Sequence, residues 1–421
     1  MRDRLQREFG KISGRDISIS KLYVTRVFPR KDGGLTIQYE LYPRKSGSPG
    51  TEKMILCGHL LAPGGPWPDY VGNSGYDCII LDDVRLIIPI FPFDPRLKSL
   101  KRLTRFGKKS DISGSLRAIL GADVELAGCE VLGYRMEKRC VLRYTVNAQN
   151  GSFTRKKVVV KAFHSSRFDK AVRILSELEK KGFNYNSPDG ITIPRILRSD
   201  GELTAIFMED IPGLSLHFLM DKAIFSQGCS AGGRALLKLH GIDTVDLKIY
   251  TISDELGNLR KLLELISNMY PEFADSFKSR FSDLSREIPE GSSKTVLSHR
   301  DFFDKQFLYS ENRSALLDCD NAALADPALD AGNFIAHLIL RRIQHPDCAV
   351  NIDRGIDAFI KSYDNSDRDF PERTMWWIRA ALLRLSALYL LRPRWRHIGP
   401  ELLTQPLDDL GKQLSGGAYD K

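Results

Sequence analysis

Alternating apolar and polar residues mark the first part of the chain as β-rich. The alternation runs through residues 22–28 and 35–42, and the turn-forming D-G-G at 32–34 separates the two runs. Two such runs on either side of a glycine turn are typical of a hairpin. A second turn is expected at residues 45–50, followed by a strand at 54–60. We therefore predict a small antiparallel sheet.

The rest of the first 120 residues contains no motif that indicates a chemistry. Residues 78–89 are predicted to form one or two further strands, and the basic residues 97–106 a helix. Residues 1–20 are polar and are expected to be loose. We interpret residues 1–120 as an N-terminal β-rich accessory domain without an assignable function.

Residues 121–210 combine strands with a helix. Alternating apolar runs predict the strands, and a stripe of apolar residues at helical spacing, closed by Gly182, predicts the helix. The predicted strands are 130–134, 139–146, 156–163, 191–197 and 203–208, and the predicted helix is 168–181. This order indicates a small β-rich lobe.

Helical periodicity dominates residues 211–421. The predicted helices are 230–239, 254–269, 330–343, 353–363 and 372–391. Asp330 stands in the N-cap place of the third of these helices. The fold class is therefore predicted to be α+β, with a large helical lobe after the small one.

Two short apolar runs in the helical part each lead to a carboxylate. Residues 295–297 run into H-R-D, which ends at Asp301, and residues 315–317 deliver Asp318, with the amide Gln306 between them. Two strand ends thus present two carboxylates to one place. Phosphoryl transfer from a nucleotide needs such a pair, because one carboxylate orients the acceptor hydroxyl while the other holds Mg²⁺ on the phosphates.

This order of residues resembles the H-R-D-x-x-x-x-N and D-F-G signatures of protein kinases, with Gln306 in the place of the amide and Asp318 in the place of the metal-binding Asp. It also resembles the aminoglycoside phosphotransferase and choline kinase families. Their G-D-P-x-x-D-L-A-like segment is matched in order by A-D-P-A-L-D at 325–330. The resemblance spans about residues 125–395. It implies a protein-kinase-like bilobal fold behind the N-terminal domain.

The resemblance further implies a kinase that uses ATP and Mg²⁺ to phosphorylate a hydroxyl-bearing small molecule, whose identity the sequence does not indicate. It assigns Asp301 as the catalytic base or hydroxyl orienter, Asp318 as the main metal ligand and Gln306 as a second ligand. His299 and Asp330 are expected to hold the loop through hydrogen bonds that fix its backbone.

The resemblance places nucleotide binding in the small lobe, residues 121–210. Lys161 projects from an apolar strand and is expected to bring its cation to the α- and β-phosphates. Main-chain groups around Met208, Glu209 and Ile211 are expected to bind an adenine edge. A single glycine, Gly133, stands where protein kinases have a glycine-rich loop.

The acid that pairs with Lys161 stays open. Glu177 has a typical spacing from Lys161 but lies opposite the apolar stripe of its helix, whereas Glu179 lies on that stripe. If the helix is matched to the family from its last Leu backwards, the place of the acid falls at Ala171. The partner is therefore Glu177, Glu179 or neither.

Two departures from the family pattern favour a different function. Gln306 stands where the family has Asn, and Ala325 where it has Gly. Gln keeps the carbonyl oxygen that a hard cation needs but moves it one methylene further out. The alternative is a nucleotide-binding, kinase-like scaffold without catalysis.

Composition limits the possible partners. With 421 residues, 42% hydrophobic and 27% charged, the chain is expected to be globular and to form two or three packed units. It has no apolar stretch of about 18 residues and begins without an apolar signal region, so we expect a cytoplasmic protein with no membrane partner. Its seven cysteines are scattered singly, which argues against disulfides and zinc. The net charge of +9 is spread through every segment, so no nucleic-acid partner is expected, and the oligomeric state stays open.

Overall fold

The structure, a computed structural model, has the predicted mixed α+β composition and divides into two compact units. It describes residues 1–13, 18–30, 32–44, 54–71, 77–105, 110–121, 123–149, 153–243, 246–290, 294–363 and 367–416. The first unit comprises Met1–Asp169, Ile196–Asp210 and Leu391–Arg394, and the second comprises Lys170–Arg195, Ile211–Leu390 and Trp395–Lys421. The predicted domain boundaries at residues 120 and 210 stay predictions, and the first of them falls inside the first unit.

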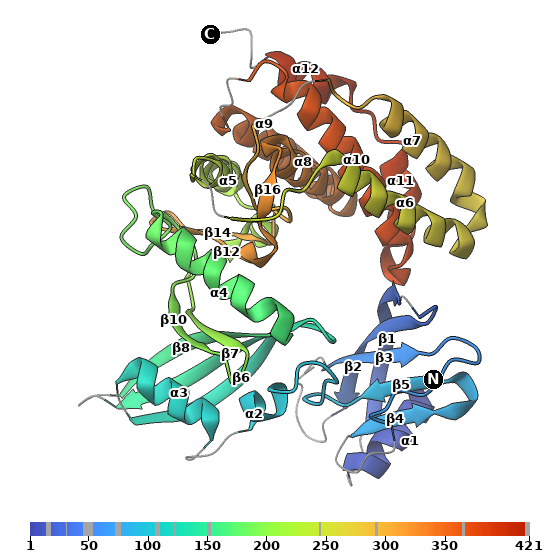
Figure 1. Ribbon diagram of the computed structural model, residues 1–421, viewed down its shortest axis with the longest axis vertical. Helices are drawn as coiled ribbons and strands as arrows, with labels where there is room; N and C mark the ends of the chain where they lie inside the picture. Colours follow the sequence, from blue (N-terminus) through green and yellow to red (C-terminus); the bar gives the residue numbers. More distant parts are fainter. Residues whose placement is uncertain are drawn as a thin grey trace. The chain divides into compact units, whose positions relative to one another are not determined.

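The first unit begins with a helix and an antiparallel sheet (Figure 1). The strands are β1 (Ser18–Pro29), β2 (Leu35–Arg44), β3 (Met54–Leu60), β4 (Cys78–Leu81) and β5 (Leu86–Pro89), in the order β1-β2-β3-β5-β4. This confirms the predicted sheet, while the turn expected at 45–50 lies outside the described residues. The expectation of a loose start is wrong: α1 (Arg2–Ser13) is a helix, because its Leu5 is buried in the core of the sheet.

A second antiparallel sheet follows in the order β10-β11-β8-β7-β6. Its strands are β6 (Asp123–Arg135), β7 (Arg139–Gln149), β8 (Phe153–Phe163), β10 (Ile196–Asp200) and β11 (Ala205–Glu209). Two helices, α2 (Leu100–Thr104) and α3 (Asp111–Leu120), pack against it (Figure 1) and share one apolar core with β7 and β8. The helix predicted over 97–106 is therefore shorter than expected, and α3 was not predicted.

The single strand predicted over residues 191–197 is wrong. The segment is divided into β9 (Ile191–Thr192) and β10, with Pro194 between them. Proline has no backbone N–H to donate and restricts the residue before it, so it interrupts a strand. β10 pairs with β11 in the first unit, whereas β9 pairs in parallel with β15 (Ser314–Leu316) in the second.

Helices dominate the chain beyond residue 164. They are α4 (Ser165–Lys180), α5 (Phe225–His240), α6 (Ile252–Met269), α7 (Ala274–Arg286), α8 (Pro327–Gln344), α9 (Ala349–Ser362), α10 (Phe370–Leu390), α11 (Ile398–Leu403) and α12 (Asp408–Gly416). The predicted helices are thus confirmed, and α7, α11 and α12 are additions. Within the described ranges, no helix has the length and apolar character that crossing a membrane requires.

Short strands of the second unit carry the two carboxylate-bearing loops. One small sheet has the order β12-β14-β15-β9, with β12 (Leu214–Ser215) and β14 (Phe307–Tyr309). The other pairs β13 (Val296–Ser298) with β16 (Ala323–Ala325). The strands predicted at 295–297 and 315–317 therefore exist as β13 and β15, and each ends just before one of the loops.

Candidate active site

The loop after β13 is fixed by a buried carboxylate from α8. Asp330 is fully buried, and its oxygens accept hydrogen bonds from the backbone N–H groups of His299 and Arg300, both at 2.7 Å. The Ser298 hydroxyl and His240 Nε2 donate to the same carboxylate at 2.9 and 3.0 Å. Burial alone would raise the pKa of Asp330, but His240 and His299, the latter through its backbone N–H, lower it below its ordinary value. Asp330 is thus an ionised anchor for the loop, as predicted.

The prediction that Asp330 caps its helix is wrong, because the helix begins earlier. Asp326 is the N-cap, and its side chain accepts a hydrogen bond from the Ala328 N–H at 3.0 Å. Pro327 follows at the first helical position, where its fixed φ suits a helix and its missing N–H costs nothing. Asp330 therefore lies inside the first turn, where its carboxylate serves the loop after β13.

His299 connects the two predicted carboxylate positions. Its Nε2 donates to the carbonyl oxygen of Leu317 at 2.7 Å, and its Nδ1 accepts from the backbone N–H of Asp301 at 3.3 Å. In this arrangement Nε2 carries a proton and Nδ1 accepts. The imidazole is buried and so ties the backbone of Asp301 to the residue that precedes Asp318. The predicted loop-holding role of His299 is confirmed.

Gln306 and Asp318 lie in contact with each other. Gln306 Nε2 donates to Asp318 Oδ2 at 3.2 Å. The backbone N–H of Leu317 donates to the backbone carbonyl oxygen of Gln306 at 2.8 Å. Asp318 has a left-handed backbone with φ of 66°, and Arg300 has φ of 65°. Non-glycine residues in this region are uncommon and cluster at functional sites. Both carboxylate-bearing loops thus begin with an unusual backbone conformation.

The chemistry of this pair suits a hard divalent cation. Asp318 offers carboxylate oxygens, and Gln306 carries an amide oxygen beside the nitrogen that bonds Asp318. Mg²⁺ is usually held by one or two such protein oxygens, with water and phosphate oxygens completing its shell. Among the residues that the structure describes, no group of three or more His, Cys, Asp or Glu side chains could hold a metal by itself. The residues therefore fit a cation that arrives with phosphates.

Sequence reasoning missed a buried ion pair beneath the loop. Asp304 accepts hydrogen bonds from Arg341 Nε at 2.9 Å and Nη2 at 3.1 Å, and from His217 Nδ1 at 2.9 Å. Burial would raise the pKa of Asp304, but Arg341 and His217 hold it well below its ordinary value. The available signal was Arg341 itself, a charged residue that directly follows the apolar residues Leu338, Ile339 and Leu340 of α8.

The residues predicted to bind the nucleotide lie mainly in the first unit. Lys161 is a buried residue of β8, between Val141 of β7 and Ile206 of β11, with its Nζ 5.1 Å from the centre of the Phe163 ring. A lysine in the middle of a sheet, with an apolar stem and a cationic end, is consistent with the predicted role.

The other predicted nucleotide contacts lie on β6 and at the end of β11. Gly133 is part of β6 beside a bulge, and a Cβ added to it would meet no atom within 4 Å. Met208 and Glu209 end β11, and Ile211 follows where the chain returns to the second unit. Met208 and Ile211 are both buried.

The acid that pairs with Lys161 stays unassigned. Glu177 accepts a hydrogen bond from Lys180 at 2.9 Å, so its carboxylate serves a pair within α4. Glu179 is half-buried on the same helix, and Ala171 is fully buried.

Comparisons with known proteins place these elements in a family. The model of the phosphotransferase enzyme family matches residues 142–388. No curated protein sequence matches the chain. The solved structures that are similar include a macrolide 2'-phosphotransferase, MphH, from Brachybacterium faecium, with 18% identity and a TM-score of 0.44 over 69% of this chain and 96% of that one.

Two further similar structures are a choline/ethanolamine kinase family protein and an aminoglycoside phosphotransferase. The first, from Mesorhizobium loti, is 16% identical with a TM-score of 0.42, over 69% of this chain and 92% of that one. The second, in the streptomycin-ATP-APH(2")-IIa ternary complex, is 15% identical with a TM-score of 0.47, over 74% of this chain and 99% of that one.

Proposed function

We propose that this chain, which belongs to the phosphotransferase enzyme family, uses ATP and Mg²⁺ to phosphorylate a hydroxyl group of a small molecule. The observation that carries the proposal is the hydrogen-bonded arrangement around His299. This residue ties the backbone of Asp301 to Leu317, and Leu317 precedes the contacting pair of Asp318 and Gln306. The order of elements in the two units supports a protein-kinase-like bilobal fold.

Asp301 is the proposed catalytic residue. Its carboxylate would accept a hydrogen bond from the acceptor hydroxyl, orient the oxygen toward the γ-phosphorus and take up the proton as the new O–P bond forms. The fixed backbone supports this role, because a carboxylate on a loop held by Asp330 and His299 loses little entropy when it engages the hydroxyl.

Asp318 is the proposed main ligand of Mg²⁺, and the amide oxygen of Gln306 a second one. When bound, the cation neutralises charge on the β- and γ-phosphates. Lys161 is proposed to contact the α- and β-phosphates, and the main chain at Met208, Glu209 and Ile211 an adenine edge. Gly133 leaves open space beside β6 where a larger side chain would project.

A nucleotide-binding assay tests the metal assignment. Asp318→Ala should abolish the Mg²⁺-dependent part of ATP affinity in calorimetry, because it removes the carboxylate that would hold the cation. Glu311→Ala removes an exposed carboxylate between β14 and β15 and is the matched control. Equal Mg-ATP affinity in Asp318→Ala and in the control would refute the assignment.

An activity assay separates a kinase from a scaffold. ATP consumption across hydroxyl-bearing metabolites identifies the acceptor, and Asp301→Asn should then lower the rate by about 10²–10⁴-fold while nucleotide affinity is kept. An undiminished rate in Asp301→Asn would contradict the catalytic role.

A kinase-like scaffold is the alternative, and the two departures from the family pattern favour it. Ala325 is fully buried in β16, and Gln306 is one methylene longer than the family Asn. Gln306→Asn should keep or raise activity if residue 306 is a metal ligand. A wild-type chain that binds Mg-ATP but consumes none with any acceptor would establish the scaffold.

A further inference from the structure

The turn between β6 and β7 is held by residues of the N-terminal sheet and of the segment that follows it, all within the first unit. The turn comprises residues 136–138, and Glu137 at its centre has a left-handed backbone with φ of 62°. It contains no glycine, and the nearest one, Gly133, lies inside β6. A non-glycine residue keeps such a conformation only where surrounding contacts over-determine it.

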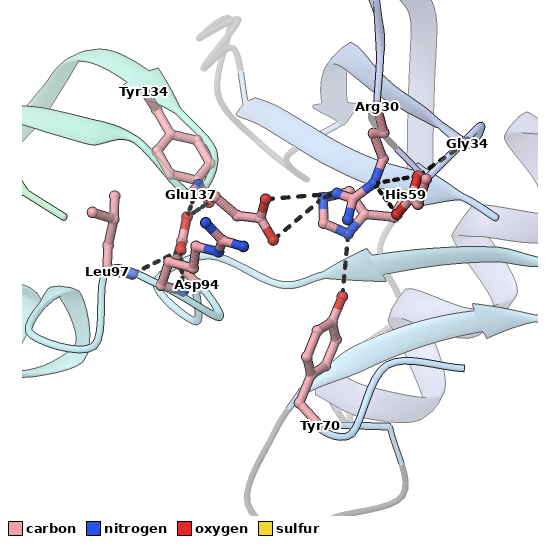
Figure 2. Close-up of polar contacts among 10 residues, drawn as sticks. Arg30, Gly34, His59, Tyr70, Asp94, Leu97, Tyr134 and Glu137 are labelled. Atoms are coloured by element: carbon pink, nitrogen blue, oxygen red, sulfur yellow. Dashed lines mark hydrogen bonds and ion pairs between the residues drawn. The ribbon is translucent and has the colours of Figure 1, made fainter. Parts of the chain in front are cut away.

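Asp94 provides the first of these contacts. The carboxylate is almost completely buried, and its Oδ2 accepts hydrogen bonds from the Glu137 backbone N–H and the Tyr134 hydroxyl, both at 2.8 Å. Its Oδ1 accepts from the N–H groups of Arg96 and Leu97 at 2.8 and 2.9 Å (Figure 2). One carboxylate thus joins the backbone of the turn to the segment that follows the N-terminal sheet.

Arg30 provides the second contact, on the side chain of Glu137, and the buried His59 lies beside the pair. The Glu137 carboxylate lies 3.6 Å from Arg30 Nη1 and 3.9 Å from His59 Nε2, as Figure 2 shows. Arg30 Nη1 donates to His59 Nε2 at 2.7 Å, and the Tyr70 hydroxyl lies 3.3 Å from His59 Nδ1. Arg30 and Glu137 are each 22% exposed, and His59 is 1% exposed. The partly buried charges of Arg30 and Glu137 interact more strongly than a surface pair.

Contacts within the β1–β2 hairpin orient the side chain of Arg30. It stands at the end of the β1–β2 hairpin, where its N–H donates to the Gly34 carbonyl at 2.9 Å. Its Nε donates to Asp32 Oδ2 at 3.0 Å, and Asp32 Oδ1 accepts from the Gly34 N–H at 3.0 Å. The guanidinium therefore reaches the turn from a fixed hairpin.

We propose that Arg30 is a positioning residue for nucleotide binding, because its guanidinium pairs with Glu137 and thereby fixes the β6–β7 turn. This inference rests on the proposed function, since the turn between the first two strands of a kinase-like small lobe is the one that covers the phosphates. A glycine-rich loop can approach phosphates through its own backbone freedom. In this chain the conformation of the corresponding turn is imposed by residues of the N-terminal sheet and of the segment that follows it.

Calorimetry with Mg-ATP on the full chain tests the inference. Arg30→Met keeps much of the apolar stem of the side chain and removes the charge, and we expect the Kd for Mg-ATP to rise about fivefold or more. Arg4→Met is the matched control, because Arg4 pairs with Asp83 in the same part of the chain without touching the turn. The Kd of Arg4→Met for Mg-ATP should equal that of the wild type. Arg30→Lys should bind Mg-ATP more tightly than Arg30→Met, because it keeps the positive charge.

Two further measurements distinguish positioning from general stabilisation. Once an acceptor is known, Arg30→Met should raise KM for ATP and leave kcat nearly unchanged. In a double-mutant cycle, Arg30→Met should have little further effect on the Kd of Glu137→Gln, because both changes break the same contact. Additive effects, or an equal loss of affinity in Arg4→Met, would overturn the inference.

Hydrogen exchange without nucleotide keeps the inference separate from the proposed function. The amides of residues 136–138 should exchange faster in Arg30→Met than in the wild type and in Arg4→Met. Unchanged exchange refutes the positioning role, whatever the chain binds. Faster exchange in a chain whose wild type binds no Mg-ATP leaves the turn supported by Arg30, but it refutes the proposed function and the nucleotide role of Arg30 with it.

Discussion

His59 is expected to make the folded chain sensitive to mild acid. The imidazole is buried, with its Nε2 accepting from Arg30 Nη1 at 2.7 Å, so its Nδ1–H is left to donate to the Tyr70 hydroxyl. Burial, and then the charge of Arg30, lowers the pKa of His59 from 6.5 to about 4. Between these two values the unfolded chain binds a proton that the folded chain does not. Neutral His59 therefore favours folding above about pH 6.5, and this stability is lost as the pH falls toward 4.

The size of the effect follows from the two pKa values. A pKa difference between 6.5 and about 4 corresponds to roughly 3 kcal/mol when the loss is complete. At about pH 5 the unfolded imidazole is almost fully protonated and the folded one still mostly neutral, so about 2 kcal/mol has been lost relative to pH 7. Other groups also titrate in this range. The informative quantity is therefore the difference between the wild type and a variant without this imidazole.

His59→Gln supplies that difference, with urea unfolding measured at about pH 7 and about pH 5. The wild type should lose about 2 kcal/mol more of its free energy of unfolding between the two pH values than the variant does. His164→Gln is the control, because His164 is more exposed and its Nδ1 bonds the nearby Ser166 hydroxyl. Equal losses of the free energy of unfolding in the wild type and in His59→Gln would refute this expectation. An NMR titration in which the His59 resonance follows its ordinary pKa would refute it as well.

Further changes test the packing of the second unit by urea or thermal unfolding. Asp304→Asn should lower the free energy of unfolding by about 3–5 kcal/mol, because it leaves the buried guanidinium of Arg341 without its counter-charge; a loss of less than about 1 kcal/mol would contradict this. Gly332→Ala should cost about 1–3 kcal/mol, because its Cβ would lie 2.6 Å from the Cβ of Trp377. Gly257→Ala, where a Cβ meets nothing within 4 Å in the middle of α6, should instead stabilise by about 0.5–1 kcal/mol, and the same sign in both glycine variants would refute the packing argument.

Local sequence was sufficient for most elements and for the order of the site residues. Apolar periodicity predicts α8 and α10, and short apolar runs that end in a carboxylate predict β13 and β15, because these signals depend on residues a few positions apart. Pro194 shows where this reasoning fails. The apolar residues on either side of it read as one strand, but β9 and β10 join different sheets, and only long-range pairing decides that.

The contacts around Arg30 could not be predicted for the same reason. Arg30 and His59 are 29 residues apart, and each is unremarkable in its own strand or turn. Asp94 and Tyr134 are 40 residues apart. Such pairs share no period and no motif, so a single sequence contains no signal that joins them. They become visible only when the N-terminal sheet and the β6–β7 turn are placed in one unit.

Local sequence identifies the site carboxylates, whereas long-range contacts determine their orientation. Asp318, like Arg300 before Asp301, has a left-handed backbone that costs of order 1–3 kcal/mol and must be compensated by contacts elsewhere. Arg300 is held by the bond from its N–H to Asp330 and by the Tyr250 ring, 3.7 Å from its guanidinium carbon. Asp318 follows a carbonyl that His299 holds. Because the contacts that compensate the strain come from residues 18 or more positions away, the motif identifies the carboxylates, and the tertiary structure determines where they point.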